Sequence, residues 1–154
     1  MKKFELTGEF KILFGRKLFR IRALVNFRDV ESGDLGGYVE KEENLSHDGD
    51  AWVYGNAQVY GDARVYGNAQ VCGNAQVYGN ADYASVKGFG SEYRSTTFFR
   101  TKDGNIGVRC GCFYGTLDAF REKVKETHGD TKYAQEYLMI SELMELHFAG
   151  GKQQ

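Results

Sequence analysis

The sequence contains no proline, no long hydrophobic run and almost no net charge. Its 154 residues include 20 Lys and Arg against 21 Asp and Glu, and the pI is about 6.3. This balance removes the overall positive potential on which nucleic-acid and anionic-membrane binders usually depend. No apolar run approaches the roughly 18 residues of a membrane-spanning helix. We therefore expect neither a membrane partner nor sequence-specific binding of nucleic acid.

Cysteine is scarce, and its positions argue against disulfides. The three cysteines are Cys72, Cys110 and Cys112, and the one-residue spacing of the last two strains a direct S–S bond. Charged residues interrupt the N-terminal stretch where a signal peptide needs an apolar run. These features predict a reduced protein of the cytoplasm.

A six-residue repeat dominates the middle of the chain. From Ala51 the sequence reads AWVYGN, AQVYGD, ARVYGN, AQVCGN and AQVYGN. Ala and Val lie two positions apart in every unit, so both point to one face of a strand. Each Gly-Asn or Gly-Asp pair suits a sharp turn. The abundant glycine therefore indicates the turns of an ordered repeat rather than disorder.

Register distinguishes the two folds that such a repeat can form. In a β-meander with Gly-Asn hairpins, Tyr54 lies opposite Ala57, so no consistent apolar face results. A solenoid that bends every six residues directs each Ala and Val to its axis and closes a coil every three units. The sequence thus predicts a mainly β protein: a short β-helix at 39–86, with an N-terminal β cap at 1–38 and a C-terminal α+β cap at 87–154. The repeat resembles the left-handed β-helix of hexapeptide-repeat proteins, and this resemblance implies a left-handed coil.

Local signals predict the elements of the two caps. The expected elements are strands at 10–14, 18–25, 95–100 and 105–113, and helices at 117–127 and from 130 or 131 to 148. Gly15 and Asp103-Gly104 supply the hairpin turns. Thr116 is the expected N-cap of the first helix, and Gly129 ends it.

Two segments resemble sequences of known proteins. Residues 32–57, with SGDLGGYV and GDAWVYGNA, resemble the beginning of the repeats in uncharacterised bacterial and phage hexapeptide-repeat proteins, which are described as polymer-forming or hexapeptide-transferase-like. Residues 93–130, with YRSTT, RTKDG and CGCFYGT, are similar to a tail on phage-associated chains of that kind. The resemblance implies a hexapeptide-like homotrimer and a phage setting, hence the host cytoplasm, and says little about activity.

Candidate catalytic and metal sites are weak. Hexapeptide acyltransferases use a His as general base, but the units from Ala51 to Val86 contain none, and we expect nearby His47 to be structural. Cys110 and Cys112 could bind zinc with a histidine, but core packing is the favoured interpretation. We assign no catalytic residue, no metal ligand and no cofactor.

The strongest candidate for ligand binding follows the repeat. Guanidinium groups and hydroxyls suit phosphate or carboxylate, and aromatic rings suit a base. The candidate residues are Tyr93, Arg94, Thr96, Thr97, Phe99, Arg100, Lys102 and Arg109. The alternative is an ordinary charged strand face.

Tyrosines at one position of the repeat form a candidate subunit interface. They are Tyr54, Tyr60, Tyr66 and Tyr78. Regularly spaced large aromatic side chains suit contact with another subunit of a homotrimer, and the alternative is that they cover the corners of a single chain.

Taken together, these patterns favour an oligomeric, non-catalytic binding protein. Its expected partner is a small anionic, nucleotide-like ligand or, for a phage factor acting against host defence, a host protein. A hexapeptide-type acyltransferase and a structural assembly protein are the alternatives.

Overall fold

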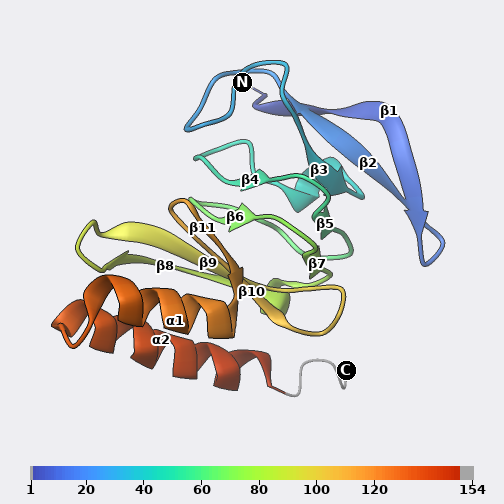
Figure 1. Cartoon of the computed structure of the whole chain (residues 1–154). Helices are drawn as coiled ribbons and strands as arrows, with labels where there is room; N and C mark the ends of the chain where they lie inside the picture. The colour runs from blue at the N-terminus through green and yellow to red at the C-terminus, as the bar shows by residue number, and fades with distance from the viewer. Residues whose placement is uncertain (1, 150–154) are drawn as a thin grey trace.

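The computed structural model describes residues 2–149, which form three sheets and two α-helices (Figure 1). The elements are β1 (Phe4–Leu13), β2 (Arg16–Ala23), β3 (Leu35–Val39), β4 (Trp52–Val53), β5 (Gln58–Val59), β6 (Gln70–Val71), β7 (Gln76–Val77), β8 (Tyr83–Phe89), β9 (Arg94–Arg100), β10 (Ile106–Cys110), β11 (Phe113–Thr116), α1 (Leu117–His128) and α2 (Lys132–Phe148), with short 3-10 turns at Glu42–Asn44 and Asn80–Asp82. Figure 1 shows the β1–β2 hairpin at one end of the molecule and the helices at the other.

The three sheets differ in size and direction. The largest has the order β1-β2-β3-β5-β7, antiparallel among its first three strands and parallel from β3 onward. Strands β4 and β6 form a second, two-stranded parallel sheet. The third is antiparallel with the order β11-β10-β9-β8.

The predicted β-helix is wrong. The repeat contributes strands of only two residues, which divide between a mixed five-stranded sheet and a two-stranded sheet. At residue 45 the pairing is reduced to a single bridge between Leu45 and Val65. An antiparallel hairpin, β1–β2, extends β3, so among residues 2–149 no closed sheet and no regular parallel β-helix forms. β3 also crosses the expected boundary at residue 38, and the three-part division of the chain stays a prediction.

The inward orientation of the repeat is confirmed. Val53, Val59, Val65, Val71 and Val77 are completely buried, and the alanines of the same units are also buried. Neighbouring strands of the repeat pair in parallel at an offset of 18 residues, so that Val53 lies against Val71 and Val59 lies against Val77. The Ala and Val side chains of all five units meet in one core.

A buried amide secures the bend after β3. Asn44 is inaccessible to solvent, and its Oδ1 accepts from the backbone N–H groups of Glu40 and Lys41 at 3.1 and 2.9 Å. Its Nδ2 donates to the carbonyls of Gly61 and Ala63 at 3.2 and 2.9 Å. One side chain thus bonds backbone groups at Glu40 and Lys41 and also at Gly61 and Ala63. The six-residue pattern of the sequence does not predict this link.

The C-terminal helices follow their predicted signals. Thr116 accepts a hydrogen bond from the Ala119 N–H at 3.1 Å, and Gly129 ends α1 with a φ of 58°. Thr131 is the N-cap residue of α2. Both helices cover one face of the four-stranded sheet (Figure 1), and their apolar residues pack against Phe98 and Val108.

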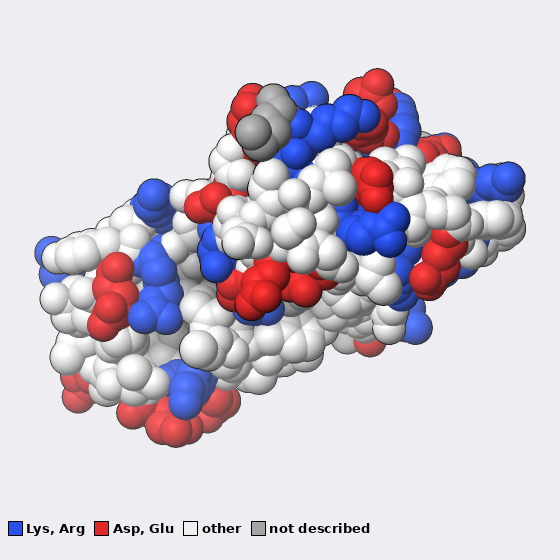
Figure 2. Space-filling model, turned by 90° about the horizontal axis from the view of Figure 1, so that it is seen from above, with Lys and Arg blue, Asp and Glu red and all other residues white. Residues whose placement is uncertain are grey.

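On the face that Figure 2 shows, patches of Lys and Arg lie near patches of Asp and Glu, with wide uncharged areas between them. Among residues 2–149, no helix is both long enough and apolar enough to cross a membrane.

Replacing Asn44 with Ala should lower the free energy of unfolding by about 2–4 kcal/mol, because several buried backbone groups would lose their partner. Asn68→Ala is the matched control, since Asn68 contacts Arg28 through its main-chain carbonyl. We expect the control to cost less than about 1 kcal/mol in the same urea titration. Equal losses would contradict the bridging role of Asn44.

Lys3 should make stability depend on pH above neutrality. Its side chain is 3% exposed and donates to the carbonyls of Ala51 and Gly49 at 2.6 and 3.3 Å. Burial lowers the pKa of Lys3 from 10.5 to about 8. Between these values the unfolded chain binds more protons, so the stability of the wild type should rise with pH relative to that of Lys3→Met. Thermal unfolding of both proteins from pH 7 to 10 measures this, and parallel curves would contradict it.

Candidate functional site

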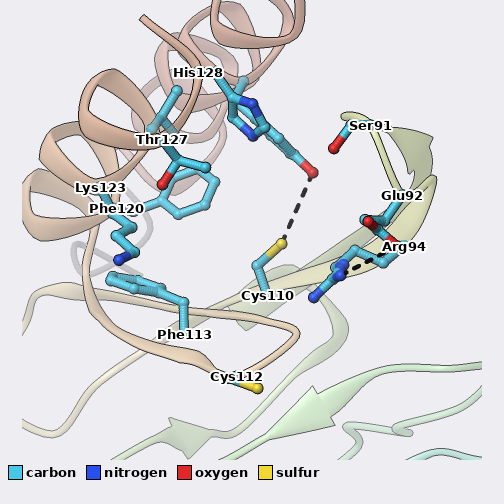
Figure 3. Close-up of a pocket in the computed structure, with 12 residues that line it drawn as sticks. Ser91, Glu92, Arg94, Cys110, Cys112, Phe113, Phe120, Lys123, Thr127 and His128 are labelled. Atoms are coloured by element: carbon cyan, nitrogen blue, oxygen red, sulfur yellow. Dashed lines mark hydrogen bonds and ion pairs between the residues drawn. The ribbon is translucent and has the colours of Figure 1, made fainter.

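A pocket of about 330 Å³ lies between α1, the β10–β11 hairpin and the turn that joins β8 to β9 (Figure 3). We call it the cap pocket. It is lined by Ser91, Glu92, Arg94, Cys110, Cys112, Phe113, Phe120, Lys123, Val124, Thr127, His128 and Tyr137. With Tyr137 of α2, four separate segments therefore build one cavity.

Aromatic rings form the inner wall of the cap pocket. Phe120 contacts Phe113 and Tyr137, with ring centroids 5.7 and 5.5 Å apart. His128, in the last turn of α1, stacks on Tyr137 at 5.9 Å and an interplanar angle of 30°. Figure 3 shows Phe113 and His128 on opposite sides of the cavity. The wall can thus contact the faces of a flat ligand.

A small polar network lies at the base of the pocket. Thr96 donates to the Cys110 Sγ at 3.2 Å, and the Tyr137 hydroxyl lies 3.9 Å from the same sulfur (Figure 3). Tyr137 also donates to the Phe89 carbonyl at 3.1 Å. Burial, with a smaller contribution from Cys110, raises the pKa of Tyr137 to about 12. The hydroxyl is therefore neutral at physiological pH and serves as a hydrogen-bonding group.

Two cationic side chains stand among the pocket residues. Arg94 makes a loose ion pair with Glu92 at 3.7 Å, and Lys123 makes one with Glu126 at 3.8 Å. All four side chains are at least 44% exposed. Exposed pairs with such long separations contribute little stability, so either cation can exchange its carboxylate for a ligand anion at low cost.

Two glycines make room for the pocket side chains. A Cβ at Gly111, which has a φ of +58°, would lie 1.9 Å from an Arg94 guanidinium nitrogen. A Cβ at Gly90, with a φ of +79°, would lie 2.2 Å from the Tyr137 hydroxyl. Both positions combine a left-handed backbone with a close approach, and both conditions favour glycine. The positions of Arg94 and Tyr137 thus depend on these residues.

A second depression, which we call the arginine groove, adjoins the cap pocket. It is lined by Arg28, Asp29, Gln70, Glu92, Arg94, Ser95, Arg109, Gly111 and Cys112 and has a volume of about 530 Å³. Arg109 lies over the Tyr54 ring at 5.1 Å and donates to the Gly111 carbonyl at 2.9 Å. Arg94 lines both cavities, so it stands where they meet.

The structure distributes the residues of the predicted ligand site over several places. Arg94 lines the cap pocket, Arg94 and Arg109 line the arginine groove, and Tyr93 is exposed. Thr96, Thr97 and Phe99 are buried, with exposed fractions of at most 1%, so they do not reach the surface.

The remaining two residues of that prediction lie elsewhere. Arg100 is bound to Asp82 at 2.8 Å and covers the Phe148 ring. Lys102 lines a different depression together with Lys11. The predicted site therefore does not form one cluster.

Sequence reasoning missed the helical contribution to the cap pocket. Lys123, Thr127, His128 and Tyr137 come from α1 and α2, whereas the prediction considered the β9–β10 region. Phe120 and Tyr137 fall within the two predicted helices, but a predicted helix does not indicate that one of its edges borders a cavity. No motif in the sequence marks these positions.

The tyrosines of the repeat are covered to different degrees. Tyr60 is 7% exposed and lies beneath Tyr78 and Arg16. Tyr54 donates to Asp29 at 2.9 Å and is half-buried. Tyr66 and Tyr78 are exposed. These side chains do not form one continuous exposed row, and trimer formation through them stays a prediction.

His47 is held by contacts within the chain. Its Nδ1 accepts from the Lys3 N–H at 3.0 Å, and its Nε2 lies 2.9 Å from a Glu42 carboxylate oxygen. Its ring stacks on Phe4 with centroids 4.3 Å apart. Both ring nitrogens are therefore engaged, one with the N-terminal segment and the other with the 3-10 turn at Glu42–Asn44. Among residues 2–149, no three His, Cys, Asp or Glu side chains are grouped so that they could hold a metal ion.

Gly90→Ala should destabilise the protein more than Gly67→Ala. Both glycines have a positive φ, but a Cβ at Gly67 meets no atom within 4 Å, whereas at Gly90 it meets a buried tyrosine. Backbone strain alone predicts a loss of about 1–2 kcal/mol at Gly67, and displacement of Tyr137 should add about 1–3 kcal/mol. Urea unfolding compares the two variants, and equal losses would show that Tyr137 adapts freely.

No family model matches this chain, and no curated protein matches it. The resemblance to hexapeptide-repeat and phage proteins therefore stays a prediction, and the site itself has to indicate the function.

Proposed function

We propose that the protein binds a small organic anion carrying a flat ring, such as a nucleoside monophosphate, in the cap pocket. The observation that supports this proposal is the position of Arg94 and Lys123 beside a wall of aromatic rings. A cavity of about 330 Å³ lies at the lower end of the range for ligand sites, roughly 300–1,000 Å³. The size favours a ligand with one ring system and one anionic group.

Each part of the pocket has a role in this proposal. The rings of Phe113 and His128 contact the faces of the base, because aromatic pairs gain about 0.5–1.5 kcal/mol beyond the burial of their surface. Arg94 binds the phosphate through two parallel N–H···O bonds, a geometry that a guanidinium offers and an ammonium does not. Lys123 adds a second positive charge.

The arginine groove supports the same orientation of the ligand. Arg94 lies at the junction of the two cavities, and Arg28 and Arg109 line the groove beyond it. Asp29 and Glu92 are the acidic residues of the groove lining, so its basic residues outnumber its acidic ones. A phosphate at the junction therefore lies in a positive potential.

No observation favours acyl transfer. The histidine nearest to the repeat, His47, has both ring nitrogens bound within the chain. The cytoplasmic location, the phage setting and a host-protein partner stay predictions.

The proposal predicts that Arg94→Ala weakens the binding of adenosine monophosphate by about 10- to 150-fold, since it removes a charge-assisted contact of about 1.5–3 kcal/mol. Arg22→Ala is the matched control, because Arg22 pairs with Glu5 in the N-terminal hairpin at 2.7 Å and is far from the pocket in the chain. Isothermal titration calorimetry of wild type and both variants measures the change.

The ligand panel separates the contributions of charge and ring. Adenosine and inorganic phosphate should each bind more weakly than adenosine monophosphate, and the corresponding guanine, cytosine and uracil nucleotides test the base. Gly111→Ala, which displaces the Arg94 guanidinium but keeps its charge, should also weaken binding. The proposal is refuted if no nucleotide binds the wild type, or if the Arg22 and Arg94 variants lose affinity equally.

A further inference from the structure

The N-terminal strand β1 leaves one edge of the five-stranded sheet open, and its pairing with β2 is regular from Phe10 to Leu13, beyond an irregularity between Leu6 and Phe10. It is the outermost strand in the order β1-β2-β3-β5-β7, and among residues 2–149 it pairs with β2 alone. The opposite end of the molecule is covered by two helices (Figure 1). An open edge presents unpaired backbone groups to another strand.

The outward backbone groups of this edge can be assigned from the turn. Phe14 and Gly15 have φ values of 50° and 78°, which is the pattern of a two-residue type I′ hairpin. In such a hairpin, the flanking pair Leu13 and Arg16 exchanges hydrogen bonds, and the bonded pairs then alternate along the strands. The backbone N–H and C=O groups of Phe10 and Ile12 therefore face away from β2.

The same two residues carry exposed apolar side chains. Phe10 is 47% and Ile12 is 59% exposed. The Phe10 ring contacts Phe19, with centroids 6.0 Å apart, and Lys17 lies over it at 4.6 Å. The open edge thus combines unpaired backbone groups with an apolar row, and pairing with a second strand would cover both.

Charge selects one register for a pairing of two copies. In a symmetric antiparallel arrangement, outward residues must lie opposite outward residues. If Phe10 lies opposite Ile12, the two copies of Lys11 face each other, and if Ile12 lies opposite itself, Lys11 faces Leu13. If Phe10 lies opposite itself, each Lys11 faces Glu9 of the second copy.

Lys11 lacks a carboxylate partner within the described chain. No ion pair of Lys11 is found among residues 2–149, where its ammonium lies over the Tyr38 ring at 4.1 Å. Burial and the nearby charges of Arg20 and Lys102 lower the pKa of Lys11. Glu9 pairs with Arg20 at 2.9 Å, yet its side chain remains 56% exposed. A carboxylate that a second copy of the protein places near Lys11 would therefore be favourable.

We propose that two copies of this protein associate through antiparallel pairing of their β1 strands, centred on Phe10, with Lys11 of each copy opposite Glu9 of the other. The pairing extends the five-stranded sheet across the two-fold axis and joins the two exposed apolar rows. The cap pockets lie at the far ends of the assembly, so this interface is independent of ligand binding.

The experiment uses two charge variants, each of which should dimerise poorly by itself and should form a mixed dimer with the other. Lys11→Glu places carboxylates opposite carboxylates, and Glu9→Lys places ammonium groups opposite each other. Each variant should dimerise at least about tenfold more weakly than wild type, because the unfavourable pair occurs twice. In an equimolar mixture the charges are complementary again, so a mixed dimer should form. Sedimentation velocity over the micromolar range measures all three samples.

Each chain keeps its own substitution in the mixture, so a variant that is misfolded alone would stay misfolded there. Formation of a mixed dimer therefore reports complementary charge at the interface. Ile12→Pro is an independent variant, because it removes an outward N–H without disturbing the bonds to β2, and it should be monomeric with a melting temperature close to that of wild type. The proposal is overturned by a wild type that stays monomeric at high micromolar concentration. It is equally overturned by a trimer that Ile12→Pro leaves unchanged, or by charge variants that do not associate when mixed.

Discussion

The structure depends on the burial of small apolar side chains in the repeat, combined with parallel pairing between segments 18 residues apart. Val53 against Val71 and Val59 against Val77 form the centre of this arrangement, and strands of only two residues have few hydrogen bonds of their own. Burial of Ala and Val at roughly 25 cal/mol per Å² of apolar surface is therefore the main source of stability here. Asn44 supplies hydrogen bonds at a point where backbone pairing is interrupted.

The repeat also positions the C-terminal sheet that carries the cap pocket. The Gln70 N–H donates to the Thr97 hydroxyl at 2.9 Å, and the Lys102 N–H donates to the Asn74 carbonyl at 2.9 Å. These bonds place one face of the sheet on the repeat and leave the other for α1 and α2. Thr97 is consequently a structural residue of the junction, and the pocket forms where the helices meet the hairpin turns.

The two ends of the molecule manage their exposed edges in different ways. At the C-terminal end, an antiparallel sheet and two helices cover the repeat, with Phe98, Phe120 and Tyr137 in a second core. At the N-terminal end, the β1–β2 hairpin extends the sheet beyond β3, so that among residues 2–149 β1 is its outermost strand and has an unpaired edge. This asymmetry separates the end that contains the cap pocket from the end that leaves the β1 edge open.

The sequence alone determined the inward direction of Ala and Val and the ends of both helices, because periodicity, Thr116 and Gly129 act locally. It did not determine the sheet architecture, since a two-residue strand can join any neighbouring edge and β3 accepts a hairpin on one side. Nor did it locate the cap pocket, whose lining brings Arg94 of β9 and Lys123 of α1 to one cavity only through the tertiary packing of the helices on the sheet. The charge of Arg94 is evident from the sequence. Its exposure, and the burial of its neighbours Thr96 and Phe99, depend on the tertiary structure, because the sheet lies between the repeat and the helices.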